Sequence, residues 1–214
     1  MRSLVRFQLA PHVDFPPGFF DRADPSPDAA FYRPLRLVTH IDDGAIAAVG
    51  TLYDELGLTG RVLDLMSSWV SHFDDAPEHL TVLGMNRREL EANPMAAERV
   101  VHDLNRDPGL PFPDEFFDDV VCCVSVDYLT RPIQVFAEVA RVLRPGGRFV
   151  TTFSNRCFPT KAIRGWLAND DAGHVRIVTA YFEASGRFGP PSVDVRVPPG
   201  RGVDPLCAVW ATRA

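Results

Sequence analysis

Several features that mark particular protein classes are missing from this sequence. No uninterrupted apolar run approaches the roughly 20 residues that a membrane-spanning helix needs. Residues 1–17 contain no continuous apolar segment of the kind found in signal peptides. The four cysteines form one adjacent pair and two distant single positions, unlike a secreted disulfide framework. We therefore expect a cytoplasmic protein that neither spans nor binds a membrane.

An excess of positive charge is also missing. Lys and Arg number 22 against 28 Asp and Glu, which gives a formal net charge of −6. A broad nucleic-acid surface needs clustered basic side chains, so this balance argues against nucleic acid as a partner. Hydrophobic residues make up 46% and charged residues 23%, as in ordinary soluble domains. A chain of 214 residues can bury a core without disulfide or metal support.

The chain divides into a proline-rich beginning and a longer regular part. Residues 1–37 are rich in proline and aromatic residues, which predicts an extended N-terminal arm with little regular structure. Residues 38–214 contain no internal repeat and no long linker, so we expect one α/β domain there. Its first helix begins near residues 39–43 and ends at Gly57 or Gly60.

After residue 61, short apolar runs alternate with helical patterns. Near-continuous runs of this kind indicate parallel strands covered on both faces, and we place five of them at residues 62–66, 80–84, 100–102, 120–124 and 148–153. Helices are expected at the capping box that opens at Asn86, after Pro132, and over residues 174–185. Pro145-Gly146-Gly147 should end the helix before the fifth strand. The last two strands, at 192–197 and 206–212, read as an antiparallel hairpin at the sheet edge.

Four sequence blocks, in order and with their spacing, resemble class I S-adenosylmethionine-dependent methyltransferases of the methyltransferase type 11 group. The blocks are Val-Leu-Asp-Leu at 62–65, Asp-Leu-Asn at 103–105, the run at 110–121 and the run at 136–149 that contains Val-Leu-Arg-Pro-Gly-Gly. The resemblance covers about residues 61–153. It implies a Rossmann-like, seven-stranded, mostly parallel sheet with helices on both faces and an antiparallel edge hairpin.

The resemblance also implies roles for residues that follow the strands. Asp64 would orient the amino group of the methionine part of S-adenosyl-L-methionine, directly or through water. Asp103 would accept a hydrogen bond from the adenine amino group, with Leu104 alongside. Ser125 would line the cofactor near the reacting centre, and Tyr128 would lie close to the substrate. Read without the resemblance, Asp64 could instead cap a helix and Asp103 could form a turn.

The sequence departs from the family at two places. The loop after the first strand is glycine-rich in the family, but here residues 66–71 contain no glycine. Ser67 and Ser68 could admit the cofactor and donate to its carboxylate, or could cap a following helix. Asn86 stands where the family has an acid for the ribose hydroxyls, and an amide is a weaker, neutral acceptor. Trp69 could pack on the sugar or the adenine.

Other polar residues have two interpretations each. Asp127 and Tyr128 could deprotonate or orient a substrate, or could be a helix cap and a packing aromatic. Arg156 and Lys161 belong to a locally basic segment that could contact a substrate anion or lie in solvent. No metal site is expected, because the side chains of Cys122 and its neighbour in the strand point to opposite faces.

The sequence therefore predicts an S-adenosylmethionine-dependent methyltransferase that acts on a small molecule. Methyl transfer of this kind is an in-line displacement that depends mostly on positioning. The alternative is a catalytically inactive, methyltransferase-like binding or scaffolding protein, in which the altered loop no longer takes the cofactor. A dinucleotide oxidoreductase is disfavoured, because the sequence has no Gly-x-Gly-x-x-Gly fingerprint.

Overall fold

Seven strands form one sheet in the computed structural model, which describes residues 15–214. The strands are β1 (Arg61–Leu65), β2 (His79–Gly84), β3 (Glu98–Val101), β4 (Phe117–Cys123), β5 (Leu143–Phe153), β6 (Ser192–Val197) and β7 (Leu206–Thr212). Their order is β3-β2-β1-β4-β5-β7-β6, and β7 runs antiparallel to both of its neighbours. The predicted mostly parallel sheet with an antiparallel edge pair is confirmed.

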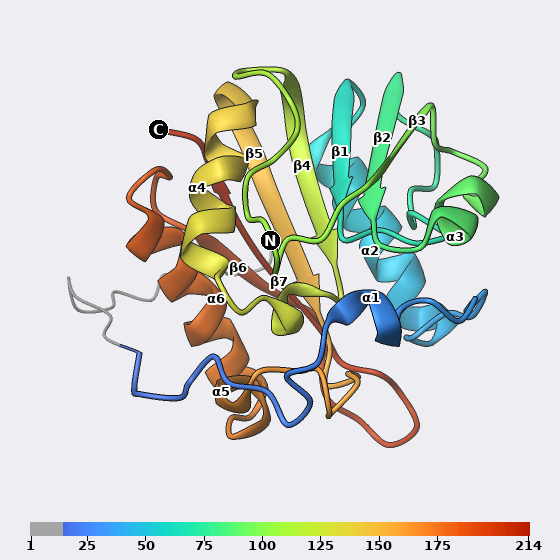
Figure 1. Ribbon diagram of the computed structural model, residues 1–214. Coiled ribbons are helices and arrows are strands. Elements are labelled where there is room, and N and C mark those ends of the chain that lie inside the picture. The colour runs from blue at the N-terminus through green and yellow to red at the C-terminus, as the bar shows by residue number, and fades with distance from the viewer. Residues whose placement is uncertain (1–14) are drawn as a thin grey trace.

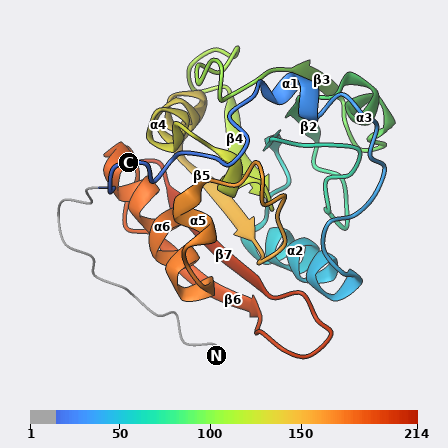
Figure 2. The same ribbon diagram turned by 60° about the horizontal axis from the view of Figure 1, so that its bottom comes forward.

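Helices cover both faces of this sheet, as Figures 1 and 2 show. The helices are α1 (Asp28–Phe31), α2 (Asp43–Leu56), α3 (Arg87–Ala92), α4 (Pro132–Val142), α5 (Arg164–Leu167) and α6 (Asp171–Ser185). Helices α4 and α6 pack on one face, and α2 and α3 lie on the other. No helix within residues 15–214 is both long enough and apolar enough to cross a membrane.

Alternation along each strand explains the two hydrophobic cores. In β1, Leu63 points into the core under α4 and α6, while Val62 points into the core under α2. Val120 and Val121 divide between the same two cores in β4. Because successive side chains of a strand point to opposite faces, an apolar run of this kind requires cover on both sides.

Local signals place the helix ends well, with two differences from the sequence-based expectation. Helix α2 begins after Asp42, whose side chain accepts from the Ala45 amide, and ends at Gly57 in the left-handed conformation. Helix α6 starts at Asp171, three residues earlier than predicted, after the cap Asp170. Pro145-Gly146-Gly147 does not form a separate stop, because α4 ends at Val142 and β5 follows at once.

The N-terminal arm, here residues 15–37, runs across the end of the sheet before α2 begins (Figure 2). It contains the short helix α1, which the sequence reading did not anticipate, and residues 1–14 of the predicted arm lie outside the described part. Backbone hydrogen bonds tie it to the segment after β5, from Asp24 N to Thr160 O at 2.9 Å and from Arg164 N to Asp21 O at 2.7 Å. The arm is therefore a fixed part of the fold over this end of the sheet.

Candidate cofactor and substrate site

A cavity of about 330 Å³ lies at the carboxyl ends of the central strands. The chain order reverses between β1 and β4, and ligands of open α/β sheets bind at such a point. Eight of the nine residues predicted from the sequence line this cavity, namely Asp64, Ser67, Ser68, Asn86, Asp103, Leu104, Ser125 and Tyr128. The arm contributes Asp28, Tyr32 and Arg36 to the opposite wall. The volume lies within the usual range for small-molecule pockets.

The glycine-free loop after β1 packs closely against the end of β2, and a glycine in β2 makes this packing possible. The Ser67 amide donates to the Leu83 carbonyl at 2.8 Å, so the loop lies directly on the end of β2. A Cβ atom on Gly84 would lie 2.1 Å from the Ser67 carbonyl oxygen. The chain also turns sharply at Met66, whose φ of 57° is left-handed. Close packing here depends on Gly84 and not on a glycine in the loop.

The two loop serines do not cap a helix, because residues 66–78 form no helix. The Ser67 hydroxyl donates to Asp64 Oδ2 at 2.7 Å, and the Ser71 hydroxyl donates to the same oxygen at 2.6 Å. Asn93 Nδ2 supports Ser71 from α3's C-terminal side at 2.7 Å. Burial raises the pKa of Asp64 to about 6, although the two hydroxyls lower it in part. Asp64 is thus a buried acceptor beside the cavity.

Trp69 does not fill the cavity. Its indole Nε1 donates to the Val38 carbonyl at 3.0 Å, so the ring is fixed against the arm while it lines the cavity wall. The open volume beside the indole shows that Trp69 does not block the cavity.

Asp103 forms a turn, as one of its two interpretations from the sequence suggested, and it also lines the cavity. Its Oδ1 accepts from the amides of Asn105 at 3.0 Å and Arg106 at 3.1 Å. Both of these bonds go to one oxygen, and Leu104 lies buried against the cavity beside it. The turn therefore holds the carboxylate in place while its other oxygen can accept a further hydrogen bond.

The side chain of Asn86 forms hydrogen bonds with the arm. Its Oδ1 caps α3 by accepting from the Arg88 amide, while its Nδ2 donates to the carbonyls of Tyr32 at 2.9 Å and Arg33 at 3.3 Å. The same amide lies 3.1 Å from Glu89 Oε1. Asn86 thus lines the cavity, while its side-chain hydrogen bonds connect α3 with the arm.

Glu89 is a cavity residue that the sequence-based prediction did not include. It is 8% exposed and accepts from the Arg36 amide at 2.8 Å and from the Ser68 hydroxyl at 2.8 Å. The sequence signal was present, because Glu89 is the third residue after the N-cap in the capping box at Asn86. That pattern predicts a bond back to the cap, and it gives no reason to expect contacts with the arm and the β1 loop.

Of the predicted site residues after β4, Ser125 and Tyr128 line the cavity and Asp127 does not. Ser125 donates to the Cys123 carbonyl at 2.9 Å, and the Tyr128 hydroxyl accepts from the Phe158 amide at 2.9 Å. Asp127 is 2% exposed and is not among the residues that line the cavity. Among the described residues its Oδ2 has no hydrogen-bond partner, and burial raises the pKa of Asp127 to about 8. Tyr128 therefore faces the cavity, while Asp127 lies in the protein interior.

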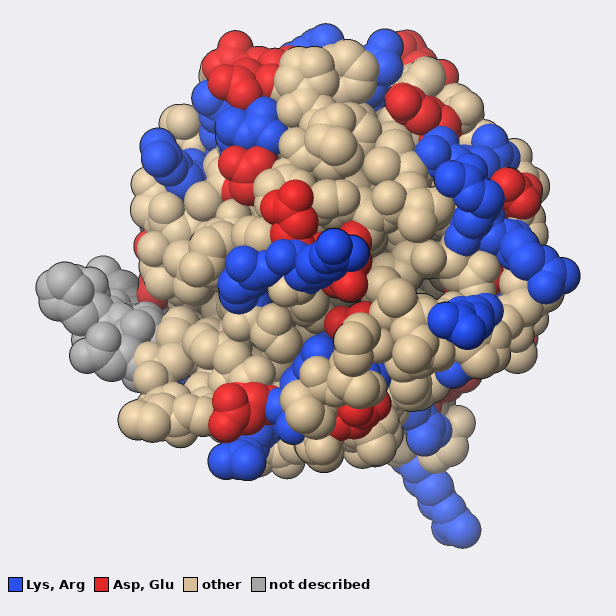
Figure 3. Space-filling view, viewed as in Figure 1, with Lys and Arg blue, Asp and Glu red and all other residues tan. Residues whose placement is uncertain are grey.

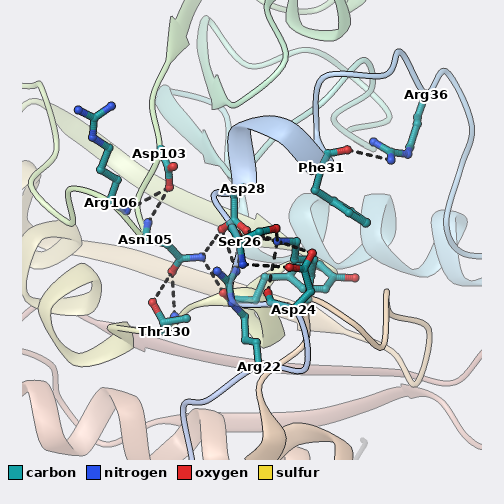
Figure 4. Close-up of polar contacts among 12 residues, drawn as sticks. Arg22, Asp24, Ser26, Asp28, Phe31, Arg36, Asp103, Asn105, Arg106 and Thr130 are labelled. Carbon is teal, nitrogen blue, oxygen red and sulfur yellow. Dashed lines mark hydrogen bonds and ion pairs between the residues drawn. The ribbon is translucent and has the colours of Figure 1, made fainter.

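A buried ion cluster fastens the arm beside the cavity, and Figure 4 shows its arm residues. Asp28 pairs with Arg22 at 2.8 Å and with Lys161 at 3.2 Å, and it accepts from Asn105 Nδ2 at 2.9 Å. Lys161 also pairs with Asp24 at 2.9 Å and is 0% exposed. Burial raises the pKa of Asp28, but Arg22, Asn105 and Lys161 together bring it below its ordinary value.

This cluster corrects the expectation for the segment after β5. Lys161 lies neither in solvent nor against a substrate anion, because two arm carboxylates neutralise it in the interior. Arg156 does line the cavity, and its Nε pairs with Asp204 at 2.6 Å while most of the side chain is exposed. No group of three or more His, Cys, Asp or Glu side chains that could hold a metal ion occurs among residues 15–214.

Comparisons with known proteins agree with this geometry. Residues 56–151 match the family described as "Methyltransferase domain". The chain is 17% identical to an S-adenosylmethionine-dependent methyltransferase of Mesorhizobium loti, with 78% of this chain and 98% of that one covered at a TM-score of 0.55. Residues 56–151 thus match a methyltransferase domain, and the fold of the chain is that of S-adenosylmethionine-dependent methyltransferases of known structure.

More specific relatives are distant or partial. The chain is 28% identical to the ubiquinone/menaquinone biosynthesis C-methyltransferase UbiE of Bordetella avium, over 56% of this chain and 44% of that protein. It also resembles a geranyl diphosphate C-methyltransferase from Streptomyces coelicolor that holds S-adenosyl-L-homocysteine, at 15% identity, a TM-score of 0.51 and coverage of 77% of this chain and 76% of that one. The chain spans less than two thirds of the length of the curated relatives it matches.

The cavity has the chemistry that S-adenosyl-L-methionine requires. S-adenosyl-L-methionine carries two cationic groups and a ribose diol. Four acidic residues line the cavity, namely Asp28, Asp64, Glu89 and Asp103. Carboxylates attract cations and accept hydrogen bonds from hydroxyl and amino groups. The donor and acceptor set therefore fits the cofactor, although the loop between β1 and β2 contains no glycine.

Proposed function

We propose that this protein binds S-adenosyl-L-methionine in the cavity and transfers its methyl group to a small molecule. The observation that carries the proposal is the cavity itself, an acceptor-lined space at the carboxyl ends of β1 and β4 in a methyltransferase fold. S-adenosyl-L-methionine, when bound, supplies an activated methyl group on a sulfonium centre. The protein's own contribution is to position the reactants and exclude water.

We assign the cofactor contacts as follows. Asp64, held by Ser67 and Ser71, accepts from the ammonium group of the methionine part. Asp103 accepts from the adenine amino group with its second oxygen, while Leu104 packs beside the ring. Ser68 and Ser125 line the wall between these positions.

We place the substrate beyond Ser125, next to Tyr128. The Tyr128 ring is 6.0 Å from the Phe158 ring, and Phe158 lies edge-on to His40 at 5.1 Å. These aromatic side chains line a cavity of about 330 Å³, and a cavity of this volume suits a small molecule better than a polymer. Acidic and basic side chains are interspersed on the face in Figure 3, and no single sign covers it. Similarity to the UbiE protein of Bordetella avium supports a small-molecule substrate.

Titration calorimetry with S-adenosyl-L-methionine and S-adenosyl-L-homocysteine tests the proposal. Both nucleosides should bind with one site per chain. Absence of heat, together with an unchanged melting temperature, would favour the inactive binding or scaffolding alternative. The observation behind that alternative is that Asn86, at the ribose position of the family, contacts the arm. The result therefore decides between the two functions directly.

Replacing Asp103 with alanine is expected to weaken S-adenosyl-L-homocysteine binding by about 1–3 kcal/mol, which is about 5- to 150-fold. The variant removes the acceptor for the adenine amino group. Asp107→Ala is the matched control, because Asp107 forms a turn in the same loop through the Gly109 amide and does not line the cavity. Calorimetry on both variants gives the comparison. Equal affinity in the wild type and Asp103→Ala would remove Asp103 from the site.

The pKa of Asp64 predicts a pH dependence for cofactor binding. The free protein holds this carboxyl with a pKa of about 6, and a bound ammonium group should lower that pKa because it favours the ionised form. Protons then compete with the ligand below pH 6, so S-adenosyl-L-homocysteine should bind about tenfold more weakly at pH 5 than at pH 7.5. Calorimetry at both pH values measures the change. Asp64→Asn should give a much flatter profile, and a wild-type profile in this variant would contradict the assignment.

A further inference from the structure

The ribose hydroxyls of the proposed cofactor present two donors, and the strand-end residue Asn86 is poorly placed to receive both. Its amide oxygen caps α3 by accepting from the Arg88 amide, and its nitrogen donates to carbonyls of the arm. The oxygen therefore has one lone pair left, and it is a neutral acceptor, weaker than a carboxylate. The structure favours another residue for the ribose.

Glu89 has the position and the charge for this contact. It is one helical turn after Asn86, it is more than nine-tenths buried, and it lines the cavity. The described residues form no ion pair with it, and its partners are the Arg36 amide, the Ser68 hydroxyl and the Asn86 amide. The cluster of arm, loop and helix donors therefore holds a carboxylate in the cavity wall without a cationic partner.

The two carboxylate oxygens of Glu89 are used unequally. Oε1 accepts from Arg36 N at 2.8 Å and from Asn86 Nδ2 at 3.1 Å, whereas Oε2 accepts only from the Ser68 hydroxyl at 2.8 Å. A carboxylate oxygen has two acceptor sites, so Oε2 can take one more hydrogen bond. The Ser68 hydroxyl can also accept a bond while it donates to Glu89. One side of the pair thus offers two adjacent acceptors.

We infer that Glu89, supported by Ser68, is the acceptor for the ribose hydroxyls of the adenosine part, and that Asn86 fastens the arm instead. The inference rests on the proposed cofactor. It also explains why a serine stands in the loop after β1, because Ser68 joins that loop to α3 through Glu89. The Arg36 amide connects the arm to the same carboxylate, so the arm, loop and ligand would share one acceptor.

The test compares two ligands that differ only in the ribose hydroxyls, 5′-methylthioadenosine and its 2′,3′-dideoxy analogue. A hydrogen bond to a charged acceptor should make the diol ligand bind about 10- to 100-fold more tightly to the wild type. In Glu89→Gln this ratio should fall to about threefold or less, because the charge is lost. Calorimetry on the full chain measures both affinities. Asn86→Ala is the comparison variant and should keep the wild-type ratio.

Each outcome has a distinct meaning. A wild-type ratio in Glu89→Gln, or loss of the ratio in Asn86→Ala alone, would overturn the inference while leaving the proposed function intact. Equal weakening of both ligands in Glu89→Gln would overturn it as well, because Glu89 would then only hold the arm. Failure of the wild type to bind S-adenosyl-L-homocysteine would instead reject the proposed function and the inference with it. If Glu89→Gln does not fold, Glu89→Asp withdraws the carboxylate and should show the same lost ratio.

Discussion

Replacing Lys161 with methionine is expected to lower the free energy of unfolding by about 3 kcal/mol, because removal of one member of a buried ion pair leaves the others without compensation. Lys161 is 0% exposed and pairs with Asp24 and Asp28. Arg22 still neutralises part of the charge on Asp28, which keeps the loss from being larger. For a chain of this size the melting temperature should fall by about 6–12 °C.

Thermal unfolding measured by circular dichroism provides the check on this prediction. Arg201→Met is a suitable control, because Arg201 is an exposed cation in the loop between β6 and β7 and its removal should change the melting temperature little. A melting temperature for Lys161→Met equal to that of the control would show that the ion pairs of Lys161 with Asp24 and Asp28 contribute no stability.

Replacing Gly84 with alanine should have a comparable effect on stability and an additional effect on ligand binding. The new Cβ atom would lie 2.1 Å from the Ser67 carbonyl oxygen, so the loop after β1 has to move away from β2. Overpacking of this kind costs about 3 kcal/mol, near the upper end of its usual range. The displaced loop carries Ser67 and Ser68, so S-adenosyl-L-homocysteine should bind at least about tenfold more weakly.

Gly189→Ala is the matched glycine control for this experiment. A Cβ atom at Gly189 would lie 3.8 Å from the Thr212 carbonyl oxygen, which is ordinary van der Waals contact. Its melting temperature and ligand affinity should both stay close to those of the wild type. Normal ligand affinity in Gly84→Ala would mean that the loop position does not determine the cofactor site.

The architecture could be predicted because its signals are local and repeated. Apolar runs such as the one around Val120 fix strands that are buried on both faces, and caps such as Asp42 and Gly57 fix helix ends. The strand ends then place Asp64 and Asp103 at one edge without further information. Both residues line the cavity in the structure, close to where the sequence places them.

The remaining details depend on contacts between distant segments, which local patterns do not encode. Lys161 looked like a solvated charge because its partner Asp28 is 133 residues earlier in the chain. Glu89 was read only as part of a capping box, since Arg36 and Ser68 meet it through the tertiary fold. The structure has no helix after β1 for Ser67 and Ser68 to cap, and the Ser67 amide bonds instead to the Leu83 carbonyl of the neighbouring strand.

The burial of Lys161 has a chemical consequence, since it is the single lysine in the sequence. Acylating and carbonyl reagents act on free side-chain amines, and the arm carboxylates at Asp24 and Asp28 shield this one completely. Such a reagent can reach Lys161 only in molecules in which the N-terminal arm has detached from the rest of the fold. Labelling of Lys161 therefore reports release of the N-terminal arm from the rest of the protein.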